Sequence, residues 1–235
     1  MPVPLHALIV ADVPVLLAVP AFGDAPWPTV LWYHGFRADA LAHAAELERC
    51  AEAGFLAVGV DAVAHGARRD HALAERVVTT EGSAMSVMLS LVDESLRELP
   101  ALISALVKSH NADAARISLV GISMGAFLAY RAIGIGLPLR AAVALLGSPE
   151  QAGANSPHDA IEAFGSVALL SVVAEHDASV PPAAARAFHD ALAMRYADPN
   201  LHRHHLLRGA GHLTNAIQWE EAMRVTMDWL DTKAR

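Results

Sequence analysis

A serine between two glycines is the residue whose surroundings point most directly to chemistry. Ser123 lies in Gly121-Ile122-Ser123-Met124-Gly125, after the apolar run 117–120 and before the helix-like stretch 126–130. The pattern Gly-x-Ser-x-Gly between a strand and a helix is typical of a sharp turn that exposes a nucleophilic serine. A side chain at either glycine would collide with the neighbouring strand or helix, so we expect both positions to need glycine. The sequence therefore predicts Ser123 as a nucleophile.

Two further residues follow strands expected later in the chain. Asp177 comes after the strand expected at 167–173, and His212 comes after the last strand, in Gly209-Ala210-Gly211-His212. A serine needs a base to activate it, and the base needs a group that orients it. The chain order serine, aspartate, histidine is the one associated with this turn, and groups at the carboxyl ends of parallel strands meet at one edge of the sheet. We therefore predict His212 as the base and Asp177 as its partner.

The neighbours of Asp177 leave its assignment open. Glu175 could take its place as the partner of the base, and His176 is the residue most easily confused with the base itself. Asp177 could instead cap the helix expected to begin near Pro182.

A second glycine turn supplies a candidate oxyanion site. His34-Gly35-Phe36 follows the strand expected at 29–33, where an ordinary turn is the alternative. Gly35 lets the chain turn close to the serine and aims the N–H of Phe36 at the reacting carbonyl oxygen. The N–H of Met124, at the start of the following helix, is the second donor.

Short apolar strands alternate with amphipathic helices along the chain. We expect strands at 6–10, 15–19, 29–33, 55–60, 116–120, 141–146, 167–173 and 204–207. We expect helices at 40–53, 83–108, 126–133, 182–195 and 215–231, the second of them kinked or divided at Pro100. The pattern predicts one α/β domain over residues 1–235, with a mostly parallel twisted sheet, an antiparallel N-terminal hairpin whose loop is 11–14, and helices on both faces.

Composition and charge exclude several classes of protein. The net charge of −8, from 17 basic and 25 acidic residues, argues against nucleic-acid binding. No apolar run approaches the roughly 18 residues that cross a membrane, and the first six residues carry no Lys or Arg of a secretory signal. The single cysteine, Cys50, is expected to be packed, since it cannot form an intramolecular disulfide. We expect a cytoplasmic protein without membrane or nucleic-acid partners.

Thirteen histidines make metal binding worth considering. His202, His204 and His205 follow strand alternation and not a recognised ligand spacing, so we interpret them as surface residues and expect no metal site.

From residue 29 to the C-terminus the chain resembles the α/β-hydrolase family. The stretch Asp61-Ala62-Val63-Ala64-His65-Gly66-Ala67-Arg68 is similar to the Asp-x-x-x-His-Gly-x-Arg loop of small bacterial esterases related to dienelactone hydrolases and prolyl-oligopeptidase-like carboxylesterases. The resemblance implies an α/β-hydrolase fold and hydrolysis of carboxylic esters without cofactor or metal. It also implies a triad of Ser123, Asp177 and His212, with Phe36 and Met124 as oxyanion donors.

The chain departs from two branches of this family. Dienelactone hydrolases proper carry a cysteine where Ser123 stands, which argues against dienelactone as substrate. Haloalkane dehalogenases and epoxide hydrolases carry an aspartate there, which Ser123 excludes. His65 could be mistaken for the base, but it follows an early strand, where the triad histidines of this fold do not lie.

The substrate site is expected to be small. Interval 147–166 is too short for a cap domain and contains Pro, Gly and Asn, so we expect loop there. Segment 69–88 could fold over the serine, and the candidate substrate-binding residues are His34, His65, Met85 and Met88. Loop 61–69 could contact substrate or only stabilise the rim, with Asp61 and Arg68 close enough to pair. A small pocket favours esters from acetyl to hexanoyl, because burying further methylenes stabilises binding only where there is room.

Alternatives to an esterase remain open at this point. Nothing in the residues distinguishes an oxygen from a sulfur leaving group, so a thioesterase or another acyl hydrolase fits as well. A peptidase of this type usually carries a propeller domain, for which 235 residues leave no room. A non-catalytic ligand-binding relative is disfavoured because every triad position is filled. The partner is expected to be a small-molecule ester, and the chain a monomer or a homodimer.

Overall fold

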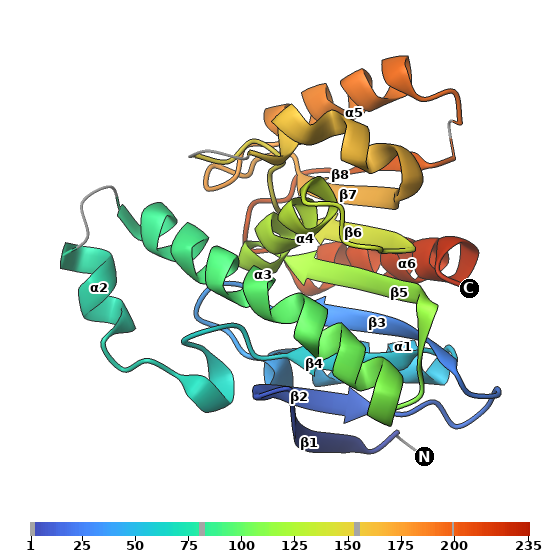
Figure 1. Cartoon of the computed structure of the whole chain (residues 1–235). Helices are drawn as coiled ribbons and strands as arrows, with labels where there is room; N and C mark the ends of the chain where they lie inside the picture. Colours follow the sequence, from blue (N-terminus) through green and yellow to red (C-terminus); the bar gives the residue numbers. More distant parts are fainter. Residues whose placement is uncertain (1–2, 80–82, 153–155, 199) are drawn as a thin grey trace.

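An eight-stranded sheet lies between two layers of helices in the computed structural model (Figure 1), which describes residues 3–79, 83–152, 156–198 and 200–235. The strands are β1 (Leu5–Val10), β2 (Val13–Ala18), β3 (Trp27–Tyr33), β4 (Leu56–Val60), β5 (Ala112–Ile122), β6 (Ala141–Leu145), β7 (Ala168–Ala174) and β8 (His202–Leu207). Their order in the sheet is β1-β2-β4-β3-β5-β6-β7-β8. The β1–β2 and β2–β4 pairs are antiparallel and the others are parallel. The predicted α/β architecture is confirmed.

The N-terminal hairpin is tighter than expected. Its turn consists of Ala11 and Asp12, whose φ angles are 50° and 65°. Two consecutive positive φ angles are those of the turn that matches the twist of paired strands, so β2 begins at Val13 and the expected loop at 11–14 is two residues too long.

Helices cover both faces of the sheet and create two apolar cores. The helical segments are η1 (Ala40–His43), α1 (Ala44–Glu52), η2 (Gly66–Arg68), α2 (Leu73–Thr79), α3 (Ser83–Ser109), α4 (Met124–Gly134), η3 (Pro157–Ser166), α5 (Ala183–Arg195) and α6 (Ala216–Lys233), where η marks a 3₁₀ helix. Side chains of α3, α4 and α5 belong to one core, and those of α1 and α6, including the buried Cys50, belong to the other. Figure 1 shows α3 and α4 in front of the sheet and α6 behind it.

Two expectations about helices are wrong. Helix α3 continues through Pro100, so the division considered there is wrong; Leu99, Leu102 and Leu106 are fully buried, and their packing outweighs one lost backbone hydrogen bond. The interval 147–166 is not only loop, because η3 lies there and packs against α4.

Active groups can gather where the parallel strands end. In Figure 1 the arrowhead of β5 points to the left, and α2 lies on that side of the sheet.

Among the described residues, no helix is long and apolar enough to span a membrane.

Candidate active site

The turn around Ser123 has the shape that its glycines predict. Ser123 stands alone between β5 and α4 with φ 49° and ψ −110°, a backbone conformation that residues with a side chain rarely adopt. A Cβ at Gly121 would lie 1.9 Å from the Gly125 carbonyl oxygen, and a Cβ at Gly125 would lie 2.3 Å from the Tyr33 carbonyl oxygen. Both positions therefore require glycine, and the strand-turn-helix expectation is confirmed.

Three side chains form a hydrogen-bonded chain across the carboxyl ends of β5, β7 and β8. The Oγ of Ser123 lies 3.0 Å from Nε2 of His212, and Nδ1 of His212 lies 2.7 Å from Oδ2 of Asp177. An ionised carboxylate only accepts, so the Nδ1–H of His212 donates to Asp177. That tautomer leaves Nε2 of His212 free to accept the hydroxyl proton of Ser123.

The Asp177 carboxylate is held by its own loop. Only 4% of Asp177 is exposed, and its Oδ1 accepts the backbone N–H groups of Ser179 at 2.9 Å and Val180 at 2.8 Å. These bonds leave Oδ2 directed at the imidazole. Asp177 does not cap α5, whose N-cap is Pro182, so the alternative role considered for it is wrong; its carboxylate holds its own loop and contacts His212.

Glu175 and His176 lie outside this chain of hydrogen bonds. Oε2 of Glu175 accepts the N–H of Gly209 at 2.7 Å and so ties the end of β7 to the loop that carries His212. The side chain of His176 is 70% exposed and lies beside Glu175. Glu175 thus supports the loop of the base without contacting the base.

The candidate oxyanion donors flank Ser123. Met124 is the first residue of α4, and the first N–H groups of a helix have no partner within it. Phe36 follows Gly35, and in the described part of the chain its N–H makes no hydrogen bond. A Cβ built on Gly35 would lie 3.7 Å from the Ser123 Cβ, an ordinary contact, so this loop approaches the serine as expected but does not require glycine for it.

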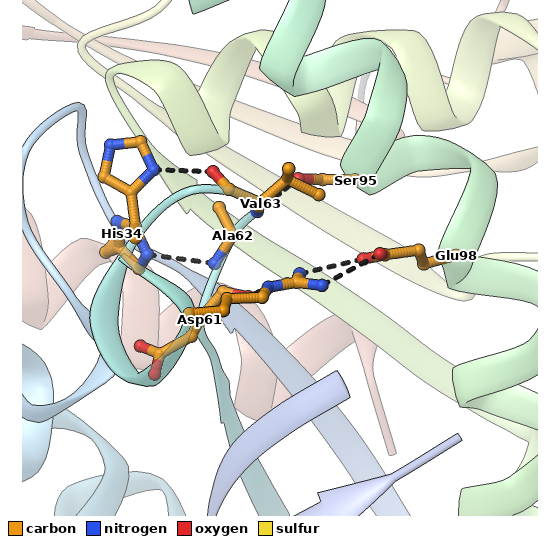
Figure 2. Close-up of polar contacts among 8 residues, drawn as sticks. His34, Asp61, Ala62, Val63, Ser95 and Glu98 are labelled. Carbon is orange, nitrogen blue, oxygen red and sulfur yellow. Dashed lines mark hydrogen bonds and ion pairs between the residues drawn. The ribbon is translucent and has the colours of Figure 1, made fainter. Parts of the chain in front are cut away.

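Two buried histidines connect the loop after β3 to the loop after β4. Nε2 of His34 accepts the N–H of Ala62 at 3.1 Å (Figure 2), and Nε2 of His65 accepts the N–H of Arg37 at 3.0 Å. Each Nδ1–H donates to a nearby carbonyl, that of His34 to Gly35 and that of His65 to Val63, both at 2.8 Å. The two loops therefore hold each other on both sides of Phe36.

The burial of His34 and His65 argues against the substrate-binding role expected for them, although His65 reaches the lining of a hollow described below. His34 is 0% exposed and His65 is 3% exposed, and both ring nitrogens of each are already bonded to the protein. Burial lowers the pKa of His34 to about 4 and lowers the pKa of His65 as well. Both rings are neutral near pH 7, as an Nε2 that accepts a hydrogen bond requires.

Asp61 and Arg68 do not form the ion pair that we expected. The Asp61 carboxylate accepts the N–H groups of Ala40 at 2.9 Å and Ala67 at 2.8 Å. The Arg68 guanidinium instead forms a two-bond pair with Glu98 of α3 and donates to the backbone carbonyl of Asp61. The loop after β4 is therefore fastened to η1 and to α3, and these contacts stabilise the rim of the site.

In segment 69–88, expected to fold over the serine, the residues that pack near the candidate site are not the predicted Met85 and Met88. Met88 is 7% exposed and belongs to the core between α3 and the sheet, so its expected place in a substrate pocket is wrong. Met85 is 37% exposed on the first turns of α3. Leu73 of α2 and Val87 of α3 instead pack with the Phe36 side chain in a small separate cluster. Residues 80–82 of this segment lie outside the described residues.

Two cavities border the site. A groove of about 420 Å³, here called the His212 groove, has an apolar part formed by Ile122, Leu146, Leu213, Ala216 and Trp219 and a polar part formed by His43, His212, Thr214 and Asn215. A hollow of about 320 Å³, here called the Arg37 hollow, lies by the other loop. Its lining includes Arg37, His65, Arg69, Asp70 and His71. Apart from His212, the groove residues were not predicted, because they come from four separate segments and have no common motif.

The clustered histidines of β8 are more buried than expected. His202 and His204 are about half-buried, and Nε2 of His202 lies 2.8 Å from the Phe164 carbonyl oxygen, so these two side chains reach the surface only in part. His205 pairs with Glu221 at 2.8 Å. Within the described ranges, no group of three or more His, Cys, Asp or Glu side chains could hold a metal ion.

Comparisons with known proteins place this geometry in a family. The model of the dienelactone hydrolase family matches residues 13–230. Esterase YjfP of Escherichia coli is 29% identical over 139 residues, which are 59% of this chain and 53% of that relative, so the match spans about half of the relative's length.

Solved structures share the fold over nearly the whole chain. TT1662 of Thermus thermophilus superposes with a TM-score of 0.77 at 23% identity, covering 98% of this chain and 99% of the other. Esterase Pf2001 of Pyrococcus furiosus superposes with a TM-score of 0.70 at 17% identity, covering 99% and 94%. At these identities the likeness concerns the fold.

Proposed function

Since the chain belongs to the dienelactone hydrolase family, we propose that it is a serine hydrolase that cleaves carboxylic esters through an acyl-serine intermediate. The observation that carries this proposal is the hydrogen-bonded chain from Ser123 through His212 to Asp177. An Escherichia coli relative described as an esterase supports the choice of an ester as substrate.

The proposed reaction has two halves that use the same base. His212 takes the proton of Ser123 as the hydroxyl attacks the ester carbonyl, and Asp177 stabilises the imidazolium that forms. The N–H groups of Phe36 and Met124 stabilise the tetrahedral oxyanion, each by about 3 kcal/mol. The protonated His212 then gives its proton to the departing alcohol. Water, activated by the same histidine, releases the acid from the serine.

The proposal includes short acyl chains, from acetyl to hexanoyl. The Arg37 hollow, on the side of the oxyanion loop, has charged side chains such as Arg37, Arg69 and Asp70 in its lining beside small apolar ones, so a long alkyl chain there would meet poorly matched surfaces. Small-molecule esters as partners and a cytoplasmic location belong to the same proposal, and the single, buried cysteine supports that location.

Hydrolysis of nitrophenyl esters of increasing acyl length tests the proposal. We expect turnover of the acetyl to hexanoyl esters, a decline towards decanoyl, and a loss of several orders of magnitude in Ser123→Ala. Full turnover in Ser123→Ala would place the chemistry elsewhere. A specificity constant that keeps rising beyond decanoyl would contradict the proposed chain length.

A further inference from the structure

The His212 groove has walls of a different character from the Arg37 hollow. Ile122 and Leu146 are 8% and 5% exposed and form apolar wall, and Leu213 stands at the mouth with 93% of its surface exposed. The Arg37 hollow has Arg37, Arg69 and Asp70 in its lining, whereas the described residues that line the groove include no Lys, Arg, Asp or Glu. An apolar part of a substrate is therefore better matched to the groove than to the hollow.

The wall formed by Trp219 is fixed in orientation. Its indole N–H donates to Oε1 of Glu46 on α1 at 2.7 Å. Trp219 also lies in the first turn of α6, which begins with a reciprocal cap between Asn215 and Gln218. A ring held in this way offers a flat apolar surface without losing side-chain freedom when a ligand binds.

The chemistry of the proposed reaction determines which part of the ester lies on this side. His212 must give its proton to the alcohol oxygen, so that oxygen lies within hydrogen-bond reach of Nε2 of His212. The carbonyl oxygen points instead to the N–H groups of Phe36 and Met124. Because His212 is itself part of the groove and Ile122 directly precedes Ser123, the alcohol portion leads from the serine into the groove.

We propose that the His212 groove binds the alcohol portion of the substrate and makes the protein selective for esters of bulky apolar alcohols. The inference rests on the proposed function, and it adds the substrate class on the leaving-group side. Leu213 and Trp219 are the residues that determine this selectivity. Each methylene that the groove buries fully raises kcat/KM about fourfold, the factor that corresponds to the transfer of one methylene out of water.

Two acetate esters with similar leaving groups test this inference. Ethyl acetate and 2-cyclohexylethyl acetate both release a primary alkoxide and form the same acetyl-serine, so their difference in kcat/KM reports binding of the alcohol. The measured quantity is the ratio of kcat/KM for the large ester to that for the small one. We expect a ratio of at least ten in the unaltered protein. Because both esters form the same acetyl-serine, kcat should be similar for the two when hydrolysis of that intermediate limits turnover.

Variants at two exposed positions assign the effect to the groove. Leu213→Ser should lower the ratio at least threefold. Leu213→Met keeps a large apolar side chain and should keep the original ratio. Ile217→Ser is the matched control and should keep the original ratio, because Ile217 lies on the helix that carries Trp219 and is 82% exposed but does not line the groove.

The outcomes separate this inference from the proposed function. A ratio near one in the unaltered protein, a ratio unaffected by Leu213→Ser, or an equal loss in Ile217→Ser would overturn the alcohol site while ester hydrolysis stands. Failure of the unaltered protein to hydrolyse either ester would contradict the proposed function itself.

Discussion

The buried carboxylate of Asp177 gives the imidazole of His212 a defined tautomer. Its two oxygens have separate partners: the loop N–H groups of Ser179 and Val180 on one side and Nδ1 of His212 on the other. Glu175, two residues earlier, uses its carboxylate to hold the N–H of Gly209. Asp177 thus orients His212, while Glu175 only supports the loop that carries it.

Replacement of each acid by its amide distinguishes these roles. The Asp177 carboxylate can only accept a hydrogen bond, whereas the amide of Asp177→Asn can also donate one and so permits the wrong tautomer of His212. We therefore expect kcat to fall about 10⁴-fold, as in other serine hydrolases. Glu175→Gln keeps an acceptor for the Gly209 N–H and should stay within a few-fold of the original rate. Steady-state kinetics on nitrophenyl acetate measure both, and the reverse order of effects would show that the third member is wrongly assigned.

The loops after β3 and β4 act as one unit around the candidate oxyanion donor Phe36. Arg37 has φ 66°, in the left-handed region that costs a residue with a side chain about 1 kcal/mol or more. Its N–H is held by His65, and the Phe36 ring lies edge-on to that imidazole with centroids 5.5 Å apart. We infer that His65 positions the backbone of Phe36 and does not touch substrate.

Loss of the His65 acceptor should affect the transition state more than substrate binding. His65→Ala should lower kcat about tenfold or more while KM changes little, because an oxyanion donor acts mainly on the tetrahedral species. His65→Gln carries a neutral acceptor of similar reach and should recover most of the rate. His205→Ala is the control, since His205 pairs with Glu221 on α6 and not with this loop. Equal losses in His65→Ala and His65→Gln would contradict the positioning role.

The sequence predicts the parts of this site that rest on local signals. The turn at Ser123 has its own glycines, and His212 and Asp177 follow strands whose ends must meet. The roles of His34 and His65 depend on partners 28 residues away, which only the folded loops bring together. Helical periodicity identified Met88 as apolar, but it could not tell whether that side of α3 meets the sheet or a substrate pocket.

Five partly or fully buried histidines make the whole molecule sensitive to acid. Burial lowers the pKa of His34 to about 4 and that of His189 to about 3, and it also lowers the pKa values of His65, His202 and His204. Between these values and the ordinary value of about 6.5, the unfolded chain binds protons that the folded chain does not. The free energy of unfolding should therefore fall as the pH falls below about 6.5.

Chemical denaturation at pH 7 and pH 5 measures this effect. His34 and His189 each contribute up to about 1.4 kcal/mol per pH unit below about pH 6.5, so together they should lower the free energy of unfolding by roughly 4 kcal/mol over this interval. His189 lies far along the chain from the loops of the site, and its Nε2 bonds Ser171 at 2.7 Å. His189→Gln keeps a polar neutral group there and should reduce the pH slope by roughly 1 kcal/mol per unit. Equal stability of the unaltered protein at the two pH values would contradict this account.

The covalent state of Ser123 tests the central claim most directly. A fluorophosphonate reacts with an activated serine and leaves a stable adduct, because attack needs the base and the oxyanion donors together. Peptide mapping by mass spectrometry should find one adduct per chain, on Ser123, formed at least a hundredfold more slowly in His212→Ala. An unlabelled protein, or an adduct on another serine, would contradict a serine hydrolase built on Ser123, His212 and Asp177.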